Sequence, residues 1–279
     1  MNVNKLFNLI SVQPLLTSQN SLIQWSYYET LMAGHLDTLE SNCDLTFICL
    51  PEYALGNKTT YSEDTFLKLK DKISLFAKEW KCTIIAGSYA HFENNKWFNR
   101  SLIFNTKGNI SYYYDKNHPF NFELLNGITP GSNKDVFVID GLKVKLLICS
   151  DLWFPEEIRN LLHEGIDVVI VPAMAVVRNN NLVDYGKSLW HSLALTRSKE
   201  NVIPVMVSDW AVQPMRDSYT CGSSCIINPS IRWYNEFEEK KAFNTLVNGT
   251  EGVISSIISK KEIMEYQKYR KEVGLLPDL

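Results

Sequence analysis

Short runs of apolar, β-forming residues alternate with stretches of helical periodicity along most of this chain. This alternation restricts the fold more than any other feature, because apolar strands separated by helices are typical of buried sheets that helices cover. The apolar runs predict strands at Leu6–Val12, Leu45–Leu50, Cys82–Tyr89, Val168–Val171, Val202–Val207 and Ser255–Ile258. The periodic stretches predict helices at Leu22–Leu39, Glu63–Trp80, Pro155–Glu164 and Asp184–Glu200.

Three further pairs of runs are joined by only a few turn-forming residues, which is typical of antiparallel hairpins. The pairs are Arg100–Asn105 with Asn109–Tyr114, Val136–Ile139 with Lys143–Cys149, and Cys225–Ile227 with Ser230–Tyr234. The sheets are therefore not expected to be purely parallel. No internal repeat, low-complexity tract or linker divides residues 1–279, so we expect one α/β domain in which two sheets lie between helix layers.

The composition argues against several classes of partner. The formal net charge is −3, and no long block of one sign occurs, so the basic footprint of a nucleic-acid binder is missing. The longest apolar run, Ile166–Val177, is interrupted by Asp167 and Pro172 and is too short to span a bilayer. The N-terminal stretch lacks the long apolar region of a signal peptide. We expect a soluble, cytoplasmic protein that binds neither nucleic acid nor a membrane.

The six cysteines are expected to be reduced, because disulfide frameworks are typical of shorter, secreted chains. Cys221 and Cys225 could bind a metal as a pair. However, no second pair of Cys or His residues lies near them at a zinc-site spacing. We therefore expect no metal site.

Three predicted strands run directly into a potentially reactive residue, namely Glu52, Lys116 and Cys149. Because ligands of α/β folds bind where loops converge at strand ends, three neighbouring strand ends could share one pocket. A carboxylate can deprotonate a cysteine nucleophile, and an ammonium group can stabilise the thiolate and an oxyanion. The N–H of Ser150 could supply a second oxyanion donor. Such a site needs no metal, cofactor or histidine, although each residue alone also fits a role in the core or on the surface.

The surroundings of these residues resemble the nitrilase superfamily of carbon–nitrogen hydrolases. The similar segments follow the order of that family and cover roughly residues 6 to 258. They are Phe47-Ile-Cys-Leu-Pro-Glu-Tyr53, Tyr114-Asp-Lys-Asn-His118, Leu147-Ile-Cys-Ser-Asp-Leu-Trp-Phe-Pro-Glu156, Arg197-Ser-Lys-Glu-Asn201 followed by Pro204-Val205, and Gly222-Ser-Ser224 to Pro229.

The resemblance implies a four-layer α-β-β-α sandwich, usually paired as a homodimer, and a mechanism that passes through a thioester. Glu52 would be the general base, Cys149 the nucleophile and Lys116 an oxyanion donor. Glu123 matches a second glutamate of the family, which would position Lys116 or the substrate; a carboxylate in a loop is the alternative. The tail 260–279 is expected either at an oligomer interface or as a frayed terminus.

The chain departs from many relatives at three positions beside the expected substrate. Ser150 replaces an aromatic residue and would leave a smaller, more polar wall. Trp153 is similar to the branch that hydrolyses N-carbamoyl amines, where an indole could stack on an alkyl amine, or it packs under the nucleophile. Asp209 could pair with a cationic substrate or be a solvated loop residue. The remaining residues expected to contact the substrate are Tyr53, Ala173 and Met174.

The leading functional prediction is hydrolysis of a small-molecule amide or ureido substrate, the latter an N-carbamoyl amine. Nitrile hydrolysis, or acyl transfer to a nucleophile other than water, could use the same site. A papain-like protease would need a histidine partner and a cysteine at a helix N-terminus. A binding or assembly protein that keeps the pocket without turnover is the non-enzymatic alternative.

Overall fold

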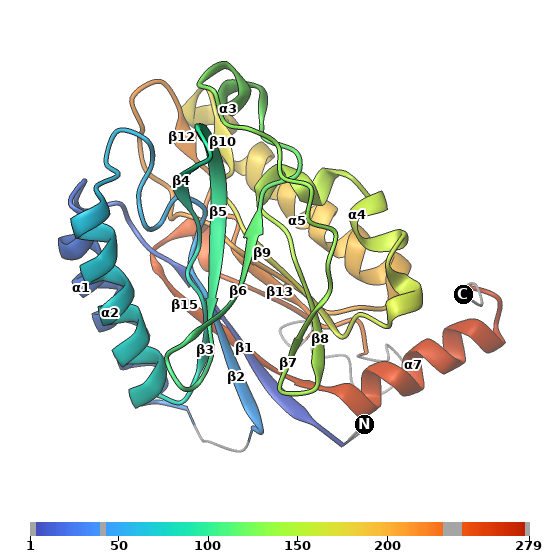
Figure 1. The fold of residues 1–279 in the computed structure, drawn as a ribbon. Helices are drawn as coiled ribbons and strands as arrows, with labels where there is room; N and C mark the ends of the chain where they lie inside the picture. Colours follow the sequence, from blue (N-terminus) through green and yellow to red (C-terminus); the bar gives the residue numbers. More distant parts are fainter. Residues whose placement is uncertain (1–3, 40–42, 231–241, 277–279) are drawn as a thin grey trace.

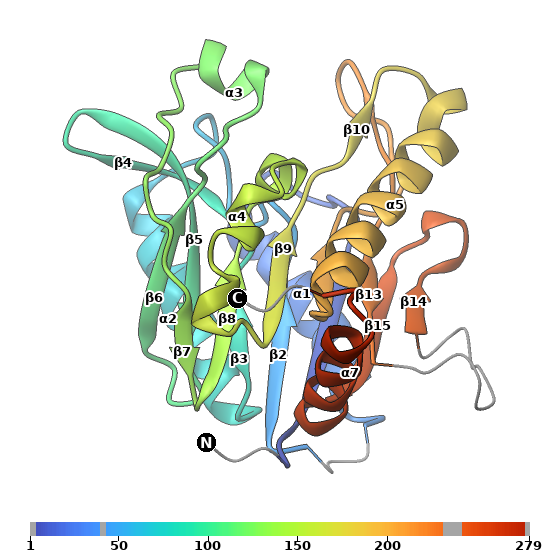
Figure 2. The same cartoon turned by 90° about the vertical axis from the view of Figure 1, so that its right-hand side faces the viewer.

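The structure is a computed structural model that describes residues 4–39, 43–230 and 242–276, and it places two β-sheets between layers of helices (Figures 1 and 2). The expected α-β-β-α sandwich is confirmed by this layering and by the solved structures that share the fold. In the described ranges, no helix is both long enough and apolar enough to cross a membrane.

The first sheet has seven strands, of which β1, β2 and β3 are parallel neighbours. Strand β6 pairs with β5 at one side of the sheet, beyond the parallel strands. In spatial order the strands are β15 (Gly252–Ser259), β1 (Leu6–Gln13), β2 (Leu45–Cys49), β3 (Thr83–Ile85), β5 (Lys96–Phe104) and β4 (Tyr89–Glu93), with β6 (Ile110–Asp115) beside β5.

The second sheet has six strands, and β8, β9 and β11 form its parallel centre. In spatial order the strands are β14 (Phe243–Thr245), β13 (Cys225–Ile227), β11 (Val205–Ser208), β9 (Val168–Pro172), β8 (Leu142–Leu146) and β7 (Phe137–Ile139). A separate two-stranded pair consists of β10 (Val176–Val177) and β12 (Tyr219–Thr220).

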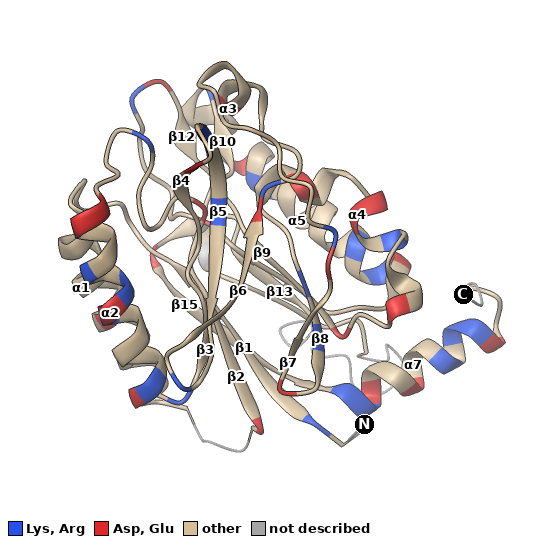
Figure 3. Ribbon diagram, in the orientation of Figure 1, with Lys and Arg blue, Asp and Glu red and all other residues tan. Residues whose placement is uncertain are grey.

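Helices α1 (Ser21–Leu36) and α2 (Glu63–Glu79) lie on the outer side of the first sheet, and α5 (Val183–Asn201) and α4 (Glu156–Arg159) lie on the side of the second (Figures 1 and 2). The short helix α3 (Asn121–Leu125) stands at one end of the sandwich, and α7 (Lys260–Glu272) extends from the other. Charged residues lie mainly on the helices and loops (Figure 3), but several, including Glu52, Lys116 and Asp151, are buried.

Alternation of side chains along the central strands builds the two apolar layers. Leu9 and Phe47 belong to the core between the sheets, whereas their neighbours Ile10 and Ile48 pack with Trp25 of α1. Two-sided burial explains why these strands read as continuous apolar runs in the sequence.

The strand expected at Cys82–Tyr89 divides at Gly87, which has a φ of 65°. A Cβ atom there would lie 2.1 Å from the carbonyl oxygen of Pro51, so only glycine permits this approach to the loop that carries Glu52. After the break, β4 forms a hairpin with β5 around Asn94 and Asn95, a pair that the sequence analysis did not identify.

Other boundaries also differ from the sequence-based expectation. The strand expected to reach Cys149 ends at Leu146, and the expected helix at Pro155–Glu164 is divided into α4 and a 3₁₀ turn, η2 (Leu162–Glu164). Residues 260–272 of the expected tail form α7. The strand expected at Ser230–Tyr234 lies, apart from Ser230, outside the described residues. Within the described ranges, β13 instead pairs with β14. The remaining short helices are η1 (Cys149–Trp153), η3 (Asn180–Leu182) and η4 (Val247–Gly249).

Candidate active site

Glu52, Lys116 and Cys149 converge between the two sheets, but not on neighbouring strands as the sequence suggested. Glu52 and Lys116 follow β2 and β6 of the first sheet, where β3 and β5 lie between those strands. Cys149 follows β8 of the second sheet. The three residues are only 3%, 1% and 8% exposed, respectively. The facing of the two sheets, rather than their strand order, brings the three side chains together.

Lys116 lies at the centre of the cluster and contacts two carboxylates. Its Nζ is 2.7 Å from Oε1 of Glu52 and 2.5 Å from Oε2 of Glu123. Burial alone would lower the pKa of Lys116, but the charges of Glu52, Cys149 and Glu123 outweigh burial and raise it. The side chain is therefore a buried cation held between two carboxylates.

The two carboxylates differ in how many donors each receives, and this separates their pKa values. Glu123 also accepts hydrogen bonds from the hydroxyl of Tyr53 at 2.6 Å and from the N–H of Phe120 at 2.7 Å. Burial opposes ionisation of Glu123, but Lys116 and these donors lower its pKa. Burial raises the pKa of Glu52 to about 7, only partly offset by Lys116. Glu123 thus remains ionised and holds Lys116, whereas Glu52 is poised to accept a proton near neutral pH.

Asn99 links both carboxylates, and the sequence analysis did not identify it. Its Nδ2 donates to Oε1 of Glu52 and to Oε1 of Glu123, each at 2.8 Å. Its main-chain carbonyl oxygen accepts from the main-chain N–H of Lys116 at 2.9 Å. Arg100 pairs with Asp115 across β5 and β6, which sets Asn99 opposite Lys116. In the sequence, Asn99 could have been indicated only by the pairing of this hairpin, extended by one residue beyond Arg100 and Asp115.

Cys149 begins η1 with a φ of 48°, a left-handed conformation that costs a non-glycine residue free energy. The buried carboxylate of Asp151 holds the turn. Its Oδ2 accepts from the N–H of Ile148 and from the hydroxyl of Tyr114, both at 2.9 Å, and its Oδ1 accepts from the N–H of His118 at 2.7 Å. This clamp connects the nucleophile turn to the segment that carries Lys116.

The Cys149 thiol needs help to ionise. Burial, followed by the charge of Glu52, raises its pKa well above the ordinary value, and Lys116 only partly opposes these effects. Its Sγ lies 3.8 Å from the carbonyl oxygen of Met174. To act as a nucleophile, Cys149 would have to lose its proton, and Glu52 is the carboxylate beside it. The N–H of Ser150 lies in the first turn of η1, where helices leave N–H groups without intrahelical acceptors.

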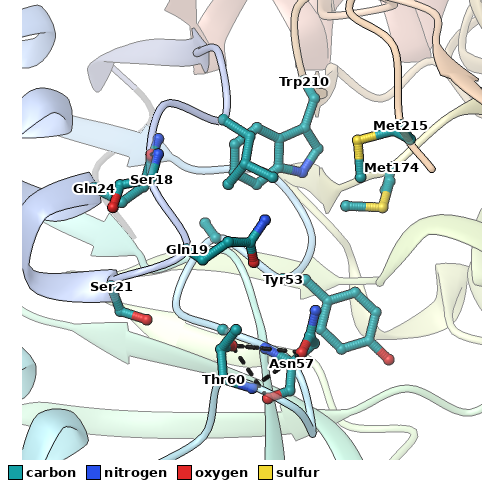
Figure 4. A pocket seen from close by; sticks show the side chains of 13 residues that line it. Ser18, Gln19, Ser21, Gln24, Tyr53, Asn57, Thr60, Met174, Trp210 and Met215 are labelled. Carbon is teal, nitrogen blue, oxygen red and sulfur yellow. Dashed lines mark hydrogen bonds between the residues drawn. The ribbon is translucent and has the colours of Figure 1, made fainter.

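Two of the expected substrate-binding residues line a pocket beside this cluster. Tyr53, with a φ of 58°, and Met174 form one side of the pocket, and Trp210 forms another (Figure 4). Ala173 is buried and contributes its backbone, since its carbonyl oxygen accepts from the N–H of Glu52 at 3.1 Å. Ser150 directs its hydroxyl to the carbonyl oxygen of His118.

Trp153 and Asp209 do not line that pocket. Trp153 is 44% exposed and its ring packs edge-on against Trp190, with ring centres 6.3 Å apart. Asp209 is fully buried, so the expectation of a solvated loop residue is wrong. Its Oδ1 accepts from the N–H of Ala175 at 3.0 Å, and its Oδ2 accepts from the N–H and the hydroxyl of Ser223 at 2.9 and 2.6 Å. Because both oxygens already have donors, Asp209 fixes two loops to each other.

This chain is similar to a known protein family and to two amidases. A family described as carbon-nitrogen hydrolase matches residues 18–242. The chain is 29% identical over 190 residues to a 2-oxoglutaramate amidase of Bacillus subtilis, covering 65% of this chain and 70% of that protein. It is 26% identical over 208 residues to an omega-amidase of Saccharomyces cerevisiae, covering 67% of this chain and 68% of that protein.

Solved structures share the fold. A branch 10 member of the nitrilase superfamily from Saccharomyces cerevisiae is similar with a TM-score of 0.78 at 20% identity, covering 100% of this chain and 98% of that one. An amidase from Nesterenkonia sp. AN1, with the acetamide moiety of fluoroacetamide bound covalently to its active-site cysteine, is similar with a TM-score of 0.69 at 13% identity, covering 98% of both chains.

Proposed function

This chain belongs to the carbon–nitrogen hydrolase family, and we propose that it hydrolyses the carbon–nitrogen bond of a small linear amide with Cys149 as the nucleophile. The observation that carries this proposal is that Lys116 contacts both Glu52 and Glu123 beside the turn that contains Cys149. One carboxylate holds the cation, and the other is free to move protons.

In the proposed first half-reaction, Glu52 takes the proton of the Cys149 thiol as Sγ attacks the amide carbon. Lys116 and the N–H of Ser150 stabilise the negative charge that forms on the carbonyl oxygen. Collapse of the tetrahedral intermediate breaks the carbon–nitrogen bond, and protonated Glu52 gives its proton to the leaving nitrogen. Ammonia or an amine departs, and the acyl group remains on Cys149 as a thioester.

In the second half-reaction, water replaces the departed nitrogen. Glu52 takes a proton from this water as its oxygen attacks the thioester carbon, and the same two donors again hold the oxyanion. The carbon–sulfur bond then breaks, the carboxylic acid leaves, and the proton on Glu52 returns to the Cys149 sulfur. The protein ends the cycle unchanged.

The contacts of Asp209 favour a simple amide over a cationic N-carbamoyl amine. That carboxylate was the expected partner of a cationic substrate, but it is fully buried and its oxygens accept hydrogen bonds from Ala175 and Ser223. The names of the amidase relatives, whose sequences are similar over about two thirds of this chain, support the same choice.

The test is ammonia release from simple amides, N-carbamoyl amines and nitriles, measured for the wild type and for Cys149→Ala. We expect release from amides, and a loss of at least about a thousandfold in the variant, since removing a nucleophile usually costs that much or more. Cys43→Ala removes a partly exposed thiol outside the site and should behave as the wild type. Turnover retained in Cys149→Ala would refute the proposal, and tight binding without turnover would favour the non-enzymatic alternative.

A further inference from the structure

We propose that the acyl chain of the substrate is uncharged and mainly apolar, and that it binds in the pocket between Tyr53, Met174, Trp210 and Gln19 (Figure 4). This inference rests on the proposed amide hydrolysis and narrows its substrate class. It excludes amides whose acyl chain ends in a carboxylate, and therefore excludes for this chain the substrate after which the Bacillus subtilis relative is named.

Three residues of the pocket also contact groups of the catalytic cluster, so the pocket lies next to that cluster although Glu52, Lys116 and Cys149 do not line it. The carbonyl oxygen of Met174 faces the Cys149 thiol, and the hydroxyl of Tyr53 donates to Glu123. The indole Nε1 of Trp210 donates to the carbonyl oxygen of Glu52 at 2.8 Å. A substrate chain that extends from the carbon attacked by Cys149 would therefore meet the pocket directly.

The pocket offers no charge to a ligand. None of the described residues that line it is Asp, Glu, Lys, Arg or His. The two cations nearest to lining residues in the sequence, Lys58 and Arg216, are not part of the lining. Lys58 donates to the carbonyl oxygen of Asn126 and lies 5.1 Å from the ring centre of Trp97, and Arg216 is 96% exposed beside Asp217. A carboxylate in this pocket would lose water without gaining a cation, which is costly.

Most polar groups around the pocket are already used by the protein itself. The side-chain oxygen of Gln24 accepts from the N–H groups of Thr17 and Ser18, both at 2.9 Å, and the side-chain oxygen of Asn57 accepts from the N–H of Thr59 at 2.9 Å. Gln19 is different, because it is an exposed residue whose amide has no partner among the described residues and is therefore open to a ligand.

Figure 4 shows the Gln19 side chain at the centre of the view, between Trp210 and Tyr53. Leu16, Ala54 and Met215 add apolar surface to the walls, which also include the polar side chains of Ser18, Ser21 and Thr60. An alkyl chain fits these walls, and one neutral hydrogen-bonding group at its end could reach Gln19.

Three amides of equal chain length test the inference: pentanamide, pentanediamide and 5-amino-5-oxopentanoate. They carry a methyl, an amide or a carboxylate at the far end and otherwise match. We expect kcat/KM for the two neutral compounds to exceed that for the anion by at least about tenfold, because desolvating an unpaired charge is unfavourable. An anion hydrolysed equally well or better would overturn the inference.

Gln19→Lys places a cation in the pocket and should raise the ratio of kcat/KM for the anion to that for pentanediamide by about tenfold. Ile23→Lys is the matched control, since Ile23 is an exposed residue of α1 near the pocket but not part of its lining. An unchanged ratio in Gln19→Lys, or an equal change in both variants, would show that the pocket does not hold the acyl chain.

Calorimetric binding of the same compounds to Cys149→Ala separates this inference from the proposed function. One outcome is that the wild type hydrolyses no amide while the variant binds the neutral compounds and not the anion. In that case the proposed amide hydrolysis is wrong, and the assignment of the pocket stands. Binding of the anion as tightly as pentanediamide, or binding of none of the three, would overturn the pocket assignment whatever the activity.

Discussion

At the scale of single residues, the site depends on two buried carboxylates that are not equivalent. Both contact Lys116, but Glu123 gains hydrogen bonds from Tyr53 and Phe120 that Glu52 lacks. The shared cation is therefore paired mainly with Glu123, and burial dominates at Glu52. A carboxylate with a pKa near neutrality is well suited to both the acid and the base steps of one cycle.

This difference predicts a pH dependence. The pKa of Glu52 is raised to about 7, and only the ionised form can accept the Cys149 proton. We therefore expect kcat/KM for a simple amide to fall about tenfold per pH unit as the pH drops below about 7, and to level off above it. Initial rates between about pH 5 and pH 9 would measure this limb. A flat profile, or activity that increases toward acid pH, would contradict the role of Glu52.

The sequence could indicate Glu52, Lys116, Cys149 and Glu123 because each stands in a short segment that resembles a known family. Asn99 could not be found in this way, since it lies within a strand and its role depends on which residue it faces across the hairpin. The buried environment of Asp209 could not be predicted for a related reason. A carboxylate after a strand can face solvent or a buried loop, and only the packing of the folded chain decides between them.

At the scale of elements, the proposed nucleophile Cys149 lies in a strained turn that other segments hold in place. Asp151 receives donors from Ile148 in the same turn, from Tyr114 at the end of β6 and from His118 just beyond Lys116. The left-handed conformation of Cys149 is thus fixed by contacts to both sheets. Such a turn could be expected from the family resemblance, but its clamp required the three-dimensional structure.

The clamp predicts a combined effect on stability and rate. Asp151→Asn replaces an acceptor for three buried donors, so we expect a loss of about 2–4 kcal/mol in the free energy of unfolding. We also expect kcat to fall by at least about tenfold because Cys149 loses its fixed position. Denaturant unfolding and initial rates would measure the two effects. Asp71→Asn, a change at an exposed position on α2, is the matched control and should alter neither. A folded Asp151→Asn with unchanged kcat would refute the positioning role.

Several element boundaries could not be predicted because tertiary contacts set them. The break at Gly87 exists because the chain passes against Pro51, and neither residue reveals that contact in the sequence. Helix α7 was not predicted because only a few of its side chains are buried, including Ile263 and Tyr266, so its apolar pattern is weak.

At the scale of the whole molecule, the sandwich makes the site by bringing two separate sheets together. The layered α/β class followed from the alternation of strands and helices, but the assignment of strands to two sheets did not. That assignment decides that Glu52 and Lys116 approach Cys149 from the opposite sheet. The homodimer implied by the family resemblance stays a prediction. In the single chain, the apolar residues Met264, Tyr269 and Leu275 near the C-terminus are exposed.

The most direct test of the central claim is to trap the acyl group on Cys149. Glu52→Gln removes the base that deacylation requires, and it also removes the charge that helps to raise the pKa of Cys149. Because p-nitrophenolate leaves without a proton, an activated ester such as p-nitrophenyl pentanoate should still acylate Cys149 and leave one pentanoyl group bound to the protein. Mass spectrometry of the digested protein should find this group on the peptide that contains Cys149, removable by hydroxylamine, and absent from the variant that also carries Cys149→Ala. An acyl group on another residue, or an equal adduct in the double variant, would contradict the assignment of Cys149 as the nucleophile.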